Sequence, residues 1–275
     1  MQRVSDYKRL WRTALSLCLG ASVCVHASAA TVRIGGSGAA IGTMRLLGQA
    51  FEEGHPDHAV RVFDGLGTSG GIKALRAKRL DIAVASRNIE AGEKDSGLTA
   101  HRYGTSAFVF ASHPDTPFLS LTQEQIAGIY ANQLATWPNG KPLRLVLTPR
   151  GDSDTELLGR ISPEVRAAVE AAHARKGMIV AMTDTAVADQ VETTPGAFAT
   201  STLAVILSEG RHVTVHAVDG IVPSVDSLTT GSYPYVKDMY MFTSRQPSDA
   251  AKQFLEFVRS AHGAEILRAA GHKTD

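Results

Sequence analysis

The chain has 275 residues, with 28 Lys and Arg against 27 Asp and Glu, which gives a formal net charge of +1. Balanced charges without a basic run argue against nucleic-acid binding as the main task. Only 6% of the residues are aromatic, so few side chains are available for stacking on bases. The length suits one large domain or two lobes.

The first 29 residues have the pattern of a secretory signal peptide. Four basic residues precede an apolar run of 12 residues, Ala14 to Val25, which is too short for a stable membrane helix, and Ala27-Ser28-Ala29 resembles a cleavage site. Both cysteines, Cys18 and Cys24, lie in this segment, so we expect no disulfide and no thiolate metal site in the mature protein. Removal of the four basic residues and one acid changes the formal charge from +1 to −2. We therefore expect a periplasmic protein without stable membrane insertion after cleavage.

After residue 29 the chain alternates between strand and helix patterns. Alternation at such short intervals predicts an α/β fold with mostly parallel sheets and helices on both faces. The first half shows, in order, a strand at 31–34, a helix at 44–51, a strand at 59–63, a helix from 72 and a strand at 81–85.

The second half continues this pattern and contains clear helix starts. Thr122 followed three residues later by Gln125 is a capping-box pattern, and Pro163 after Ser162 is typical of a first helical turn. The further expected elements are strands at 107–111, 143–147 and 239–242, an apolar run at 203–207 and a helix at 250–270.

Three turns share one design, in which hydroxyl residues open a helix directly after a strand. They contain Ser37-Gly38, Thr68-Ser69-Gly70 and Ser153-Asp154-Thr155. Ligands bind at the carboxyl ends of the strands in an open parallel sheet, so these turns can converge. Free N–H groups and hydroxyls at helix starts suit a small tetrahedral oxyanion. Arg87 and Arg150 can add charge and fork-like donors.

The glycine-rich turn also fits two enzyme motifs. Gly65-x-Gly67-x-x-Gly70 matches a dinucleotide fingerprint, but it follows the second mature strand rather than the first. Gly67-x-Ser69-x-Gly71 matches a nucleophile elbow, yet no histidine lies in a recognisable catalytic loop. An exported serine hydrolase using Ser69 is the alternative from a different class. The histidines lack metal-ligand spacing, so we expect no metal and no cofactor.

Taken together, these motifs resemble the phosphate-binding periplasmic receptors of ABC transporters, within the type II periplasmic binding protein superfamily. Matches in the family's order cover nearly the whole mature chain. They are Gly36-Ser37-Gly38, Gly67 to Lys73, Asp81 to Arg87, Leu121-Thr122, Ile126 to Tyr130, Trp137, Arg150, Ser153-x-Thr155, Pro195-Gly196-Ala197, Tyr233-Pro234, Phe254-x-x-Phe257 and Gly263.

The resemblance implies a non-enzymatic receptor of two α/β lobes that close over the anion. Residues 30–114 and 219–275 would form lobe 1, and residues 115–218 would form lobe 2. The protein would be a monomer that binds inorganic phosphate or a related oxyanion and delivers it to an ABC transporter permease; a sensor without a transporter is the alternative. By position, the resemblance implies that the phosphate donors are Ser37, Thr68, Arg150, Ser153 and Thr155. The further residues that we expect to line the binding site are Gly38, Ser69, Ser86, Arg87 and Asp154.

Two positions depart from the family pattern. Asp154 replaces the glycine of a Ser-Gly-Thr motif, and only two residues separate Arg150 from Ser153 where the family has three. Some members carry an aspartate at the end of the third strand, where this chain has Ser86. Asp154 could accept the proton of hydrogen phosphate in its place, point to solvent, or weaken the site by repulsion.

Overall fold

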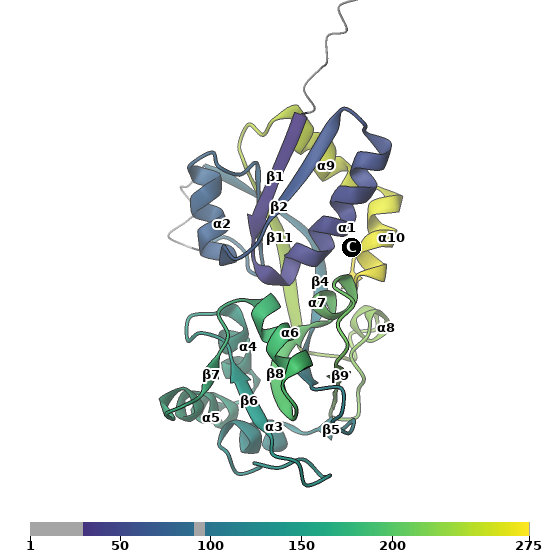
Figure 1. Ribbon diagram of the computed structural model, residues 1–275. Helices are drawn as coiled ribbons and strands as arrows, with labels where there is room; N and C mark the ends of the chain where they lie inside the picture. The colour runs from purple at the N-terminus through teal and green to yellow at the C-terminus, as the bar shows by residue number, and fades with distance from the viewer. Residues whose placement is uncertain (1–29, 91–96, 275) are drawn as a thin grey trace, which may run out of the picture.

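The computed structural model describes residues 30–90 and 97–274, which form two α/β lobes stacked one above the other (Figure 1). The expected signal peptide lies outside these described residues. Within the described ranges, no helix is long and apolar enough to span a membrane. Both lobes contribute to a mixed sheet in the order β2-β1-β3-β11-β4-β8-β6-β7.

Lobe 1, the upper lobe of Figure 1, is organised around three parallel strands. Strand β1 lies between β2 and β3 and is parallel to both, while β11 is antiparallel to β3. Because the three strands are parallel, their carboxyl ends meet at the same edge of the sheet. The strands are β1 (Ala30–Gly36), β2 (His58–Phe63), β3 (Ile82–Ala85) and β11 (Val236–Ser244), and the helices are α1 (Gly38–Gly54), α2 (Gly67–Arg76), α9 (Asp249–Arg259) and α10 (Ala261–Ala269).

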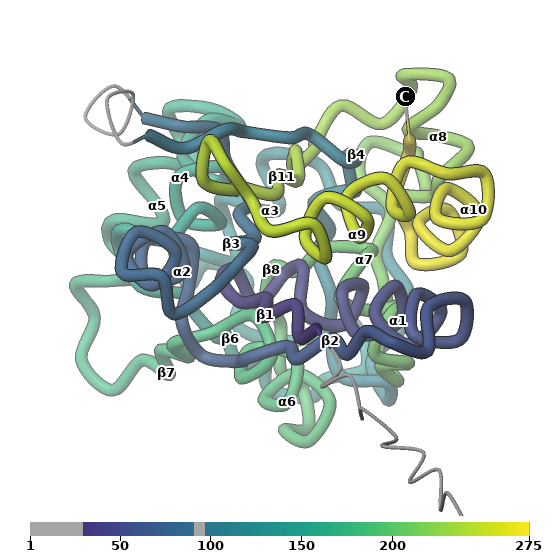
Figure 2. Tube along the Cα trace, turned by 90° about the horizontal axis from the view of Figure 1, so that it is seen from above, coloured from purple at the N-terminus to yellow at the C-terminus, as the bar shows by residue number. Residues whose placement is uncertain are grey.

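Helices cover both faces of the lobe 1 sheet, which explains why β3 is apolar at every position. Ile82 and Val84 pack into a core with α1 and α9, whereas Ala83 and Ala85 pack under α2 on the other face. Seen from above, α2 lies on one side of the lobe and α1 with α10 on the other (Figure 2). A strand buried on both faces has no polar alternation, as is typical of parallel sheets.

Lobe 2 repeats the arrangement with its own core, in which Phe108, Phe110 and Phe198 pack together. Strand β6 is parallel to β7 and to β8. Its strands are β5 (Ser120–Leu121), β6 (Arg144–Leu147), β7 (Ile179–Val180), β8 (Ala197–Thr202), β9 (Thr214–Val215) and β10 (Ala217–Val218), and its helices are α3 (Gln123–Tyr130), α4 (Ser153–Ile161), α5 (Pro163–Ala174), α6 (Asp184–Thr193) and α7 (Leu203–Ser208).

One long strand connects the two lobes. The 15-residue strand β4 (Leu98–Ser112) pairs with β11 over Leu98–Ala107 and with β8 over Phe108–Ser112. The chain returns through α8 (Val225–Thr229) and enters β11, and the short β12 (His272–Lys273) closes against β4. The lobes are therefore joined through strands β4 and β11, an arrangement that permits hinge motion.

The cap signals at Thr122 and Ser162 give the starts of α3 and α5 correctly, whereas α1 and α2 begin at Gly38 and Gly67, several residues before the expected 44 and 72. The capping box of Thr122 and Gln125 forms, and Pro163 begins α5 with Ser162 as its cap. The single helix expected at 250–270 is instead two helices, because Ser260 takes an extended backbone (ψ 166°) and caps α10 through the N–H of Gly263. The apolar run at 203–207 forms the buried helix α7.

Candidate functional site

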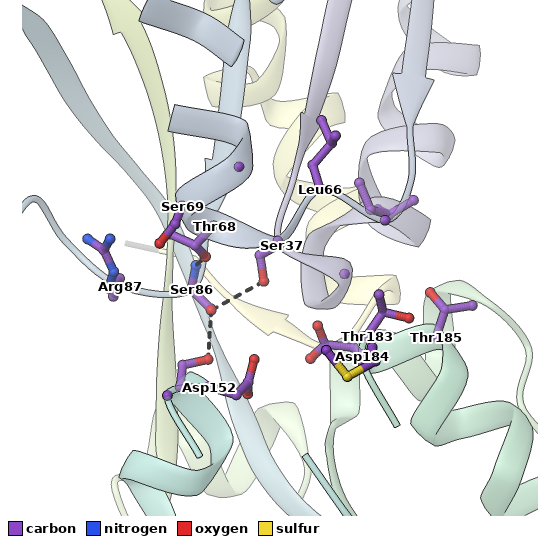
Figure 3. Close-up of a pocket in the computed structure, with 18 of the residues that line it drawn as sticks. Ser37, Leu66, Thr68, Ser69, Ser86, Arg87, Asp152, Thr183, Asp184 and Thr185 are labelled. Atoms are coloured by element: carbon purple, nitrogen blue, oxygen red, sulfur yellow. Dashed lines mark hydrogen bonds between the residues drawn. The ribbon is translucent and has the colours of Figure 1, made fainter. Parts of the chain in front are cut away.

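A cavity of about 240 Å³ lies between the lobes, at the carboxyl ends of the parallel strands (Figure 3). From lobe 1 its wall includes Ser37 and Gly38 at the start of α1, the loop from Asp64 to Gly70, and Ser86 and Arg87 after β3. From lobe 2 it includes the turn Gly151–Ser153 before α4 and residues 182–185 around the start of α6. The first and second of the three hydroxyl turns, and the first residue of the third, thus meet in one place.

The helices that open on this cavity from lobe 1 differ from the others in their capping. Neither α1 nor α2 is capped by the side chain of its own N-cap residue, Ser37 or Leu66, and neither has an acid in its first turn. Every other described helix is capped by a side chain, from Thr122, Asp152, Ser162, Thr183, Thr202, Ser224, Ser248 and Ser260. The first N–H groups of a helix need partners, and they favour an anion. The starts of α1 and α2 therefore give the cavity donors suited to an oxyanion.

Close packing between glycines brings the start of α2 to the end of β1. A Cβ atom at Gly71 would lie 2.7 Å from the Cα of Gly36, and one at Gly36 would lie 2.0 Å from the carbonyl oxygen of Val84. Gly65 and Gly67 have φ values of +74° and +64°, which side chains disfavour. The glycine pattern of this turn therefore serves backbone geometry.

Serine hydroxyls link the two lobes across the cavity. Ser37 Oγ donates to Ser86 Oγ at 3.2 Å, and Ser86 Oγ lies 3.0 Å from Ser153 Oγ in lobe 2 (Figure 3). The N–H of Ser86 donates to Thr68 Oγ1 at 3.5 Å. These hydroxyls provide further donors for an oxyanion.

Arg87 is the cationic side chain in the described lining of the cavity, and Arg150 lies elsewhere. Arg87 Nε pairs with Glu90 at 2.9 Å. Arg150 has a side chain that is 53% exposed and forms an ion pair with Glu170 on α5. The structure thus does not bring Arg150 to the cavity, because the turn from Arg150 to Asp152 directs it toward α5.

Asp154 and Thr155 also point away from the cavity, since successive residues of a helix lie about 100° apart around its axis. Thr155 Oγ1 is buried and donates to the carbonyl oxygen of Pro149 at 3.0 Å. Asp154 forms an ion pair with Lys237 of β11; the side chains are 2% and 1% exposed. None of the three roles considered for Asp154 from the sequence describes this arrangement.

Lys237 is the centre of a buried cluster of charges that sequence reasoning missed. Its Nζ also lies 3.7 Å from Asp184 Oδ1, and Asp152 is close enough to interact. Burial by itself lowers the pKa of Lys237, but the three carboxylates of Asp154, Asp184 and Asp152 together raise it above its ordinary value. Lys237 is therefore a permanent cation. A lone lysine in a strand gives no sequence signal of such a cluster.

Asp152 and Asp184 both belong to the cavity lining and to this cluster. Asp152 caps α4 by accepting a hydrogen bond from the N–H of Asp154 at 2.9 Å. Burial, and then the negative charge of Asp154, raise the pKa of Asp152 to about 6. Burial also raises the pKa of Asp184. The sequence gives little indication that Asp184 belongs to a site. The strand before it, β7, is two exposed residues without a strand pattern, so only the helix-cap residue Thr183 marks this turn.

The geometry around Ser69 does not favour a nucleophile. Ser69 lines the cavity, but no histidine is among the described lining residues, so the described site lacks the imidazole base of a Ser-His-Asp triad. Among the residues that the structure describes, no group of three His, Cys, Asp or Glu side chains could hold a metal ion.

Known proteins resemble this chain in sequence or in fold. The phosphate-binding protein PstS of Bacillus subtilis (strain 168) is 23% identical over 236 residues, which cover 84% of this chain and 75% of that protein. A solved putative phosphate ABC transporter substrate-binding protein with bound phosphate, from Clostridium perfringens, superimposes with a TM-score of 0.74 at 20% identity, covering 89% of this chain and 99% of that one. The periplasmic molybdate-binding protein of Azotobacter vinelandii gives a TM-score of 0.63 at 14% identity, with coverages of 89% and 99%. Residues 25–262 match the PBP superfamily domain. The chain therefore belongs to the PBP superfamily and has the type II periplasmic binding protein fold.

Proposed function

We propose that this protein is a receptor for a small tetrahedral oxyanion and that it binds the ion between its lobes. Phosphate is the first candidate for this ion. The observation that carries the proposal is the pair of helix starts, α1 and α2, that lack a cap from their own N-cap residues and open on one cavity beside the hydroxyls of Ser37, Thr68 and Ser86. The names of its relatives, which include a PstS and a phosphate-bound receptor, support phosphate as the first candidate.

The mechanism follows from the hinge. Lobe closure would remove water from the ion and replace its hydration shell with backbone N–H groups and hydroxyls from both lobes. Ser153 comes from lobe 2, whereas Ser37 and Ser86 come from lobe 1, so the full set of donors is assembled only when the lobes approach. As an exported receptor, the protein would deliver the ion to an ABC transporter permease for uptake.

Calorimetry of the exported protein with phosphate, arsenate, sulfate and molybdate tests the binding function. We expect phosphate and arsenate to bind, and Thr68→Val to weaken phosphate binding about tenfold because one hydrogen bond to a charged group is lost. Ser248→Ala, which removes the cap of α9, is the control and should leave the affinity unchanged. Absence of binding to all four ions would refute the proposal.

Uptake measurements separate transport from sensing. A strain that lacks the protein should take up phosphate more slowly at low external concentration. Normal uptake in that strain, together with phosphate binding by the protein, would instead indicate a sensor that works without a transporter.

A further inference from the structure

The carboxylate of Asp184 reaches from lobe 2 to the N-terminus of α1 in lobe 1. A Cβ atom at Gly38 would lie 2.6 Å from Asp184 Oδ2 and 3.1 Å from its backbone nitrogen, so only glycine permits this approach. The backbone N–H of Ala39 lowers the pKa of the Asp184 carboxyl. Figure 3 shows Asp184 and Ser37 on facing walls of the cavity. Lobe 2 thus places the Asp184 carboxylate at the start of α1 in lobe 1.

The charge of Asp184 is only partly balanced elsewhere. Lys237 forms its direct ion pair with Asp154, and its Nζ lies 3.7 Å from Asp184 Oδ1. Asp152 is a third carboxylate near the same ammonium group. Burial raises the pKa of Asp184, whereas Lys237 and the backbone N–H of Ala39 favour its ionised form. The positive end of the α1 dipole acts in the same direction as these two groups.

We propose that Asp184 acts as an internal anion, which occupies the start of α1 in the ligand-free protein, holds the two lobes together, and is displaced from α1 when an oxyanion binds. The proposal rests on the proposed function for the identity of the competitor. Gly38 and Asp184 both line the cavity, and Asp184 Oδ2 lies against Gly38, so an oxyanion that binds the first N–H groups of α1 requires the space that the Asp184 carboxylate occupies. Asp184 thereby sets both the affinity for the ion and the resting position of the lobes.

The substitution Asp184→Asn tests this proposal, because it removes the negative charge of the side chain and retains its shape. Calorimetry with inorganic phosphate should show binding that is about 3- to 30-fold tighter than in the unmodified protein, the size of a helix-terminus charge interaction. Small-angle scattering of the ligand-free variant should show a larger radius of gyration, because the link between the lobes is weakened. Asp184→Ala should change both quantities in the same direction, which gives a second variant if the first folds poorly.

Asp189→Asn is the matched control. It removes the same charge from the same helix, α6, but Asp189 pairs with Arg211, and neither residue belongs to the described cavity lining. Both the phosphate affinity and the radius of gyration should remain unchanged in this variant.

The outcomes separate this proposal from the proposed function. Weaker phosphate binding in Asp184→Asn with an unchanged radius would overturn the proposal and make Asp184 a direct partner of the ligand. Unchanged values of both would also overturn it, leaving Asp184 a structural residue. If phosphate fails to bind the unmodified protein while the ligand-free variant still expands, the link between the lobes stands and the proposed function fails.

Discussion

The ammonium group of Lys237 and the carboxylate of Asp154 form an ion pair from which water is almost excluded, with side chains 1% and 2% exposed. Lys237 belongs to β11, which carries the chain back into lobe 1, and Asp154 belongs to the first turn of α4 in lobe 2. The pair therefore connects the start of α4, which lines the cavity, to the strand β11, which joins the two lobes.

Removing the cation from this pair should strongly destabilise the protein. Lys237→Met leaves the buried carboxylates of Asp154 and Asp184 without their counter-ion, and breaking a buried pair in this way costs about 3–5 kcal/mol. Urea unfolding measures the change in the free energy of unfolding. Lys252→Met is the matched control, because Lys252 pairs with Asp249 in solvent, and it should have no measurable effect. Adding Asp154→Asn to Lys237→Met should restore part of the loss; equal stability of Lys237→Met and the unmodified protein would contradict the assignment.

Two adjacent glycines of α2 should respond in opposite ways to alanine. A Cβ atom at Gly71 would lie 2.7 Å from the Cα of Gly36, so Gly71→Ala should force α2 away from β1 and cost about 1–3 kcal/mol. At Gly70 the nearest atom is 3.6 Å away, an ordinary contact, so Gly70→Ala should stabilise the helix by about 0.5–1 kcal/mol. Thermal unfolding of both variants measures the difference. Equal effects at the two positions would contradict the close approach seen here.

Local sequence was enough to predict the parts of the site that depend on neighbouring residues. A strand followed by a hydroxyl residue and a helix start fixes where Ser37, Thr68 and Ser153 lie, because the carboxyl ends of parallel strands share one edge. The capping box at Thr122 is equally local. These predictions need only a short sequence pattern and a rule of sheet topology, so they can be made without knowledge of tertiary contacts.

The parts that could not be predicted depend on partners distant in sequence. Asp154 is directed by Lys237, 83 positions away, and Arg150 by Glu170 on a neighbouring helix. Asp184 faces α1 across the cleft, and no local pattern marks that contact. The direction of a side chain at a helix start is set by helix phase and by packing, and a motif match does not carry this information.

Arg150→Ala should leave the affinity for phosphate within about twofold of the unmodified value. The ion pair of Arg150 with Glu170 is exposed to solvent, and Arg150 is not part of the described cavity lining. An exposed pair contributes about 0–1 kcal/mol, so the stability should also change little. Calorimetry with phosphate checks this expectation, with Thr68→Val as the variant that does weaken binding. A loss of more than tenfold would show that Arg150 moves into the site when the ion binds.

The pH dependence of oxyanion binding should reveal Asp152. Its pKa is raised to about 6 by burial and by the charge of Asp154, with Asp184 acting in the same direction and Lys237 opposing them. Below about pH 6 the Asp152 carboxyl in the cavity wall is neutral, and above that pH it carries a negative charge that repels the ligand. The contribution of Asp152 to affinity should therefore fall as the pH rises through about 6, and binding near that pH should take up protons.

Asp152→Asn isolates this effect, because asparagine is neutral at every pH and still caps α4. The ionisation of phosphate itself is common to both proteins and cancels in the ratio of their affinities. The two proteins should bind phosphate equally at pH 5, and the variant should bind about 3- to 10-fold more tightly at pH 8, as expected for one like charge near the ligand. Calorimetry in two buffers of different ionisation enthalpy counts the protons, and the variant should take up fewer. Parallel pH profiles with equal proton uptake would show that Asp152 remains ionised throughout or lies too far from the ion to influence it.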